Sequence, residues 1–159
     1  MKKILSTITI ASLILYSPTI VLASEDISNE KATHLSDSAE ISRVITSQGT
    51  IHQFKVHVRE NPLSEVTINL PEKVETLEEI EVIDTNGQKL ATEVNIDNGI
   101  ANIAFFQPVP VNTFVSIKMH GIKDSGVSNR NWLYRVYGEE VGLTEDIPLG
   151  TAKIQTFRR

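Results

Sequence analysis

The sequence predicts an all-β protein, an immunoglobulin-like sandwich of two antiparallel sheets with seven or eight strands. Short stretches in which apolar and polar residues alternate recur along residues 41–159, as in strands that bury one face. Turn-forming Gly, Pro, Asn and Asp separate these stretches. Beyond residue 23, no segment repeats apolar residues at the spacing of an amphipathic helix. A small β-barrel is the alternative architecture.

The first 23 residues have the composition of an export signal. Lys2 and Lys3 precede an uncharged apolar run, which closes on the small-residue sequence Val-Leu-Ala. Pro18 interrupts the run and an acidic stretch follows it, which argues against a transmembrane anchor. We therefore expect cleavage between Ala23 and Ser24, export to the periplasm or the extracellular space, and no transmembrane anchor after signal removal.

Residues 24–40 are rich in Ser, Asp, Glu and Asn and contain no aromatic residue. Such a segment buries too little apolar surface to offset the entropy cost of ordering, so the sequence predicts a flexible polar lead-in. Residues 41–159 are then expected to form a single sandwich domain, which is long enough to bury a core without disulfides or a structural metal ion.

Composition excludes several classes of function. The chain has no cysteine, so disulfides, thiolate metal sites and a cysteine nucleophile are excluded. Its formal net charge is −5 and it has no dense basic cluster, which argues against a nucleic-acid partner.

The first strand of the domain is predicted at residues 53–59, where successive side chains alternate between two faces. We expect the polar residues of its outer face to lie opposite acidic residues of a neighbouring strand. A second strand follows, up to the break at Pro71. The predicted inward residues of the two strands are Phe54, Val56, Val58, Val66, Ile68 and Leu70.

Residues 79–84, 90–96 and 100–106 are predicted to form a meander of three strands. The dipeptides Asn86-Gly87 and Asn98-Gly99 separate them, and Asn-Gly favours the type I′ turn of a tight hairpin. The predicted inward residues are Leu90, Thr92, Val94 and Ile96 in the middle strand and Ala101, Ile103 and Phe105 in the last.

The remaining strands are expected at residues 114–120, 132–137 and 152–157. The first should turn Val115, Ile117 and Met119 inward. The second is apolar or aromatic on both faces, which is typical of a strand covered on both sides.

Several segments match the pattern of a known family. They are Phe54-Lys55-Val56-His57-Val58, Val66-Thr67-Ile68, Phe105-Phe106-Gln107-Pro108-Val109-Pro110 with Thr113 and Val115, and Leu149-Gly150. With them, residues 50–157 resemble the secreted family of domain of unknown function 2808, which occurs mainly in cyanobacteria. Arg135 departs from the family pattern, in which a small residue is commoner at that position. The resemblance implies an exported protein of a photosynthetic bacterium and carries over no catalytic residue.

Four histidines are the candidate metal ligands: His34, His52, His57 and His120. His52 and His57 are five residues apart in one strand and point to opposite faces, so they cannot share a metal. A periplasmic copper carrier that uses His34 with His52 or His120 is one alternative function. The other interpretation is that these are ordinary strand histidines.

Other motifs have simpler explanations. The Asp-Asn-Gly stretches at residues 84–87 and 97–99 lack the distal Glu of a calcium loop and are explained as turns. Glu139-Glu140 and Glu145-Asp146 are adjacent loop carboxylates without a visible cleft. His120, Asp124 and Ser125 are close only in sequence, so a hydrolase with an unrecognised site stays a second alternative.

The candidate binding residues are Arg130, Trp132 and Tyr134, because Trp, Tyr and Arg dominate binding hot spots. The competing interpretation, which we favour for Trp132, is an anchor in the sandwich core. With no cofactor and no catalytic residue in view, the leading hypothesis is an exported, non-enzymatic module that binds a protein or a polysaccharide of the cell envelope.

Overall fold

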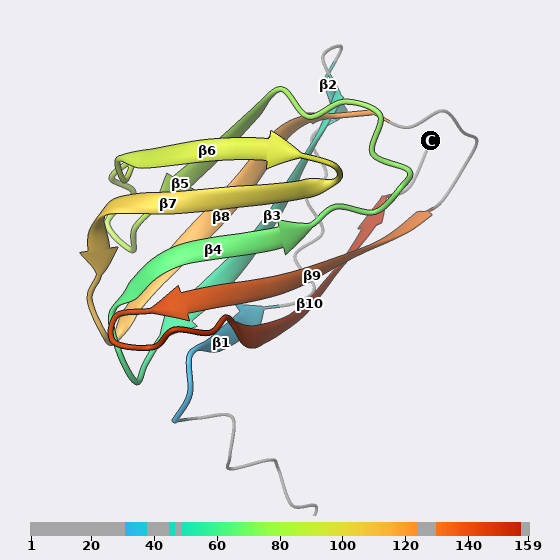
Figure 1. Cartoon of the computed structure of the whole chain (residues 1–159). Helices are drawn as coiled ribbons and strands as arrows, with labels where there is room; N and C mark the ends of the chain where they lie inside the picture. Colours follow the sequence, from blue (N-terminus) through green and yellow to red (C-terminus); the bar gives the residue numbers. More distant parts are fainter. Residues whose placement is uncertain (1–30, 38–44, 47–48, 124–129, 157–159) are drawn as a thin grey trace, which may run out of the picture.

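A computed structural model of the chain describes residues 31–37, 45–46, 49–123 and 130–156. Within these ranges all regular structure is β, arranged as two antiparallel sheets (Figure 1). The predicted all-β sandwich is confirmed. The described ranges contain no helix long and apolar enough to cross a membrane. The expected signal, with its cleavage site at Ala23 and Ser24, lies outside them.

The described residues form ten strands, more than the seven or eight expected. Sheet A has the order β1-β3-β8-β5, with β2 paired to β3, and sheet B has the order β10-β9-β4-β7-β6. The strands of sheet A are β1 (His34–Asp37), β2 (Ile45–Thr46), β3 (Gly49–Val58), β5 (Glu79–Ile83) and β8 (Thr113–Ile122). Those of sheet B are β4 (Leu63–Asn69), β6 (Thr92–Asp97), β7 (Ile100–Val109), β9 (Arg130–Glu140) and β10 (Ile147–Thr156).

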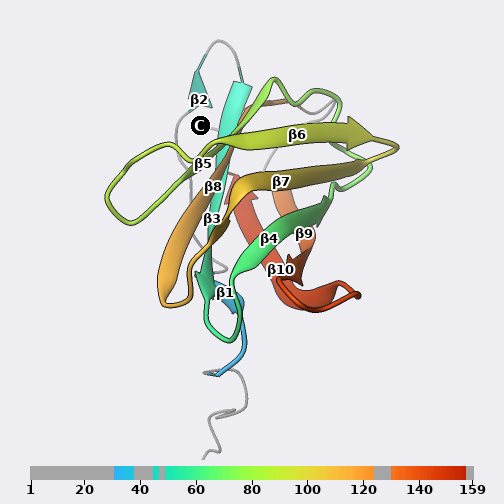
Figure 2. The same cartoon turned by 60° about the vertical axis from the view of Figure 1, so that its left-hand side comes forward.

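The core lies between the two sheets, which Figure 2 shows from a second direction. The inward residues predicted for β3, β7 and β8 are all buried there, as are Val66 and Ile68 of β4. Ile96 of the edge strand β6 is 45% exposed, so the inner face of sheet B is less covered towards this edge. Removal of the inner faces from water is the main force that holds the two layers together.

Strand β9 corrects one prediction. Residues 132–137 were expected to be covered on both faces, but the structure covers only one. Trp132, Tyr134 and Val136 face the core, whereas Leu133 is 54% exposed and Arg135 is also exposed. The outer face of sheet B is open to solvent at β9, so apolar residues on both sides of a strand did not indicate burial on both sides.

The predicted meander is wrong in its middle, because β5 and β6 belong to different sheets. Both turns do form. Asn98 and Gly99 have φ values of 48° and 78°, as a type I′ turn requires, and join β6 to β7. Before that hairpin the chain changes sheet: the Leu90 amide donates to the Val82 carbonyl of β5, and the Phe106 amide of β7 donates to the Ala91 carbonyl.

The lead-in predicted at residues 24–40 is ordered in part. Residues 34–37 form β1, which pairs with β3, and the Thr33 side chain is 2% exposed. The Thr33 hydroxyl donates to the carboxylate of Glu140, which is itself 1% exposed, and accepts the Arg59 amide at 3.0 Å. Asn61 Nδ2 donates to the second Glu140 oxygen at 3.0 Å. These polar contacts order a segment that has little apolar surface of its own.

Gly150 makes room for this N-terminal strand. A Cβ at Gly150 would lie 3.3 Å from Leu35 Cδ1, and the φ of 132° is one that side-chain-bearing residues rarely adopt. Leu35 packs against the core from β1. The first strand of sheet A therefore lies against the last strand of sheet B and closes one side of the sandwich.

Truncation of Ile117 tests which face of each sheet is inside. Ile117 is fully buried on β8, so Ile117→Ala should lower the free energy of unfolding by about 2–5 kcal/mol through lost burial and a residual cavity. The control Leu133→Ala removes an exposed side chain and should change it by no more than about 0.5 kcal/mol. Urea unfolding measures both. Equal losses would contradict the assignment of the inner face.

Truncation of Glu140 tests the attachment of β1. Glu140→Ala leaves the Thr33 hydroxyl and the Asn61 amide without their acceptor, which should cost about 1–3 kcal/mol. Amide hydrogen exchange should accelerate in residues 34–37 more than in the central strand β8. The control Glu145→Ala alters an exposed carboxylate and should leave exchange unchanged. Unaltered protection of β1 in Glu140→Ala would contradict the anchoring role.

Candidate binding site

The residues predicted to bind a partner lie mostly in the core. Trp132 and Tyr134 are 3% and 0% exposed and both contact His52 across the gap between the sheets. The Tyr134 hydroxyl lies 2.6 Å from His52 Nδ1, and the ring centroids of His52 and Trp132 are 4.9 Å apart. Burial raises the pKa of Tyr134 above its usual value.

The structure thus corrects the binding interpretation for Trp132 and Tyr134, because these side chains have almost no surface to offer a partner. The competing interpretation, a core anchor, describes them. Arg130 begins β9, and its side chain lies outside the described residues.

The four candidate metal ligands lie in three different environments. His52 is in the core, His34 lies beside His57 with ring centroids 5.5 Å apart, and His120 Nε2 is 3.7 Å from a Glu81 carboxylate oxygen. The copper-carrier hypothesis required His34 to lie near His52 or His120. The structure places His34 beside His57 instead. In the part of the chain that the structure describes, no three His, Asp or Glu side chains form a group that could hold a metal ion.

The other motifs have structural roles. Asp84 Oδ1 accepts the amides of Asn86 and Gln88 at 2.9 and 2.8 Å, so the first Asp-Asn-Gly stretch is a turn that its own aspartate stabilises. Glu140 is the buried anchor of Thr33. Asp124 and Ser125, the proposed partners of His120 in a hydrolase, lie outside the described residues.

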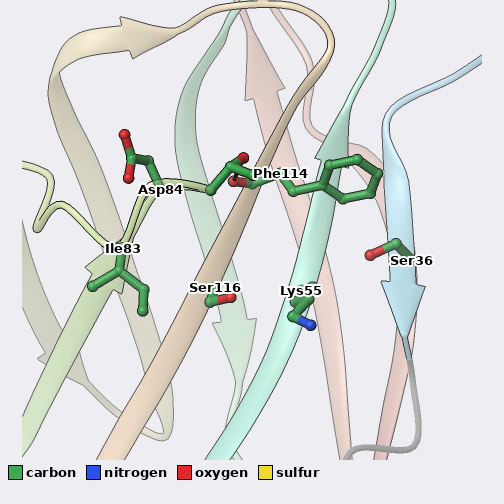
Figure 3. A pocket seen from close by; sticks show the side chains of 8 residues that line it. Ser36, Lys55, Ile83, Asp84, Phe114 and Ser116 are labelled. Carbon is green, nitrogen blue, oxygen red and sulfur yellow. Dashed lines mark hydrogen bonds between the residues drawn. The ribbon is translucent and has the colours of Figure 1, made fainter.

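A hollow of about 560 Å³ lies on the outer face of sheet A (Figure 3). We call it the Phe114 hollow. Its lining comes from β1, β3, β8, β5 and the turn after β5: Ser36, Lys55, Ile83, Asp84, Thr85, Gly87, Phe114 and Ser116. Strand register explains the arrangement, because Ser116 pairs with Lys55 on one side and with Ile83 on the other. A small side chain between longer neighbours leaves the space open.

Phe114 is the aromatic wall of the hollow, and its position is constrained. It is 39% exposed, and it stacks on the His57 ring with centroids 3.9 Å apart and an interplanar angle of 18°. The Thr85 hydroxyl donates to the Phe114 carbonyl at 3.2 Å, which ties the turn after β5 to β8. The ring is therefore both supported from behind and accessible to a ligand.

His57 was expected to lie opposite an acidic residue, and this is wrong. Its partners in register are His34 on β1 and Phe114 on β8. Burial, followed by the charge of Arg59 and the neighbouring His34, lowers the pKa of His57 below its usual value. The neutral ring is thus favoured beneath Phe114. Lys55 was also expected to lie opposite an acidic residue, and in the strand register its Cα partner on β1 is Asp37.

Asp84 lies at the rim of the hollow, and its carboxylate points away from Lys55 and Phe114 (Figure 3). Its Oδ1 is occupied by the two turn amides, and Asn86 Nδ2 approaches Oδ2 at 3.4 Å. Across the hollow, Lys55 supplies an ammonium group from β3 (Figure 3). A ligand in this hollow would therefore meet one aromatic ring, one ammonium and hydroxyl groups, with a carboxylate at the rim.

Sequence reasoning placed Lys55 on an outer face and Asp84 in a turn but did not bring them together. The pairing of β8 with both β3 and β5 joins segments that are far apart in the chain. The available signal was Phe114, an aromatic residue out of phase with the inward residues of its strand.

Comparison with known proteins assigns this chain to no family. No protein-family model and no curated protein matches the sequence. Solved structures with a similar arrangement include the collagen-binding domain of a Staphylococcus aureus adhesin, with a TM-score of 0.40, 9% identity, and coverage of 80% of this chain and 96% of that one. The major pilin subunit BcpA of Bacillus cereus has a TM-score of 0.44, 12% identity, and coverage of 77% of this chain and 39% of the pilin.

A third similar structure is the C-terminal domain of the Streptococcus pyogenes antigen I/II-family protein AspA. Its TM-score is 0.41 at 13% identity, with coverage of 79% of this chain and 46% of that one. This chain therefore spans less than half of the BcpA and AspA chains. At such values the likeness assigns neither a family nor a function to this chain.

The lowered pKa of His57 predicts a dependence of stability on pH. The unfolded chain, with the ordinary histidine pKa of 6.5, takes up the proton more readily than the folded protein. Stability should therefore fall as the pH decreases through 6.5 and stop falling from this cause below the folded pKa. In His57→Gln the fall should be smaller. Urea unfolding at several pH values measures it, and an NMR titration midpoint of His57 at or above 6.5 would contradict it.

Proposed function

We propose that the protein is an exported, non-enzymatic β-sandwich module that binds a component of the cell envelope, a protein or a polysaccharide, at the Phe114 hollow. The observation that carries the proposal is an exposed aromatic ring held rigid by a stacked histidine beside fixed polar groups. Concave sites that combine apolar surface with a few placed polar groups are typical of ligand binding. A rigid aromatic residue also loses little conformational entropy on binding.

The proposal is non-enzymatic because of how the polar groups of the hollow are used. Asp84 holds its own turn through Oδ1, which suits a fixed hydrogen-bond acceptor better than a group that must exchange protons during a reaction. Ser116 lies between Lys55 and Ile83 in register, where its hydroxyl can donate to or accept from a ligand. Binding through shape and hydrogen bonds needs neither group to react.

Export and location belong to the same proposal. The signal-like first 23 residues support delivery to the periplasm or the extracellular space. Membership of the secreted family of domain of unknown function 2808 would agree with this and stays a prediction. The acidic net charge of −5 supports a partner other than nucleic acid.

Capture of envelope material tests the proposal. The immobilised protein should retain a component of the envelope fraction of its source, and Phe114→Ser should reduce the retained amount about tenfold or more by removing the aromatic wall. The matched control is Phe106→Ser on sheet B, because Phe106 is 70% exposed and lies outside the hollow. Equal retention by both variants, or a loss confined to Phe106→Ser, would contradict the assigned surface.

A further inference from the structure

We infer that the ligand of the Phe114 hollow is a neutral sugar, bound as a pyranose ring that stacks on Phe114. This inference rests on the proposed function and names the class of ligand for the same site. It follows from three properties of the hollow: one accessible aromatic face, a ring of mixed hydrogen-bonding groups, and a balance of charge.

The aromatic face matches the apolar side of a sugar. A pyranose carries C–H groups on one face and hydroxyl groups around its rim, so it packs flat on an aromatic ring while its rim stays polar. Phe114 offers such a surface, since His57 stacks on it at 3.9 Å and the side chain is 39% exposed. The stack keeps the ring oriented before the ligand arrives, which reduces the entropy cost of binding.

The polar groups match the rim of a sugar. Lys55 can donate to sugar hydroxyls, and the Ser116 hydroxyl can both donate to them and accept from them. Among the described residues, the Ser36 hydroxyl is removed from water and has no hydrogen-bond partner. This oxygen has almost no accessible surface, so it adds polarity to the β1 side of the hollow but is not open to a ligand from outside.

The charges favour a neutral ligand over an anionic one. Lys55 faces the hollow and Asp84 lies at its rim, so one positive charge is matched by one negative charge. His57 beneath Phe114 is held towards its neutral form. Phosphate or uronate recognition would call for an excess of positive groups. The volume of about 560 Å³ lies within the range of small-ligand pockets.

Saturation-transfer NMR tests the inference with defined probes. The purified protein is mixed with glucose, galactose, mannose and N-acetylglucosamine, each as monosaccharide and as trisaccharide, at about 10 mM, which detects dissociation constants of about 1 mM. We expect transfer to the C–H protons of at least one sugar. N-acetyltyrosinamide represents a protein side chain, and glucuronic acid represents an anionic sugar.

Two variants and one control locate the binding. Phe114→Ala should weaken sugar binding about tenfold or more by loss of the stacking surface. Lys55→Met should weaken it roughly two- to tenfold, as expected for one hydrogen bond. Phe106→Ala should bind like the wild type. Thermal unfolding shows whether each variant is folded. If Phe114→Ala is not folded, Phe114→Leu replaces it, because leucine keeps an apolar side chain but removes the aromatic face.

The outcomes separate this inference from the proposed function. No transfer to any neutral sugar, transfer that is unchanged in Phe114→Ala or Phe114→Leu, or stronger transfer to N-acetyltyrosinamide or glucuronic acid overturns the inference. If Phe114→Ser at the same time abolishes capture of envelope material, the proposed function stands with a protein or an anionic ligand. If neither sugars nor envelope material depend on Phe114, both fail.

Discussion

Face-to-face packing of two apolar sheet surfaces is the constraint on which the rest of this structure depends. Side chains alternate along a strand, so the burial of Phe54 and Val56 inside sheet A also places Lys55 and His57 on its outer face. A shift of β3 by one residue would expose the core residues and bury the charged ones. The register that fills the core therefore also determines which side chains surround the Phe114 hollow.

Hydrogen bonds across the two sheets complement this packing. His52 and Tyr134 connect β3 with β9 inside the core, and Glu140 of β9 accepts from Thr33, just before β1. Apolar surfaces are tolerant of how they are placed, whereas a buried polar group is costly unless its partner is in position. We interpret these contacts as the features that set how the two sheets and the N-terminal segment are placed relative to each other.

The candidate site is a product of pairings between distant segments. Phe114 on β8, Lys55 on β3 and Asp84 after β5 come together because β8 pairs with both β3 and β5. The site needs no irregular insertion: a small Ser116 at the crossing of these rows and an aspartate-stabilised turn at the end of β5 are sufficient. Binding groups on the outer face of a packed sheet can vary without disturbing the core.

The sequence by itself determined the all-β class, the inward faces of β3, β7 and β8, and the type I′ hairpin at Asn98-Gly99, because each depends on neighbours along the chain. Only the tertiary structure decided that β5 and β6 belong to different sheets, that Tyr134 is a core residue, that the polar segment before β2 contributes a strand, and that a hollow forms beside Phe114. Local alternation shows which side of a strand is apolar but not which strand lies next to it, since strand pairing is set by the packing of segments far apart in sequence.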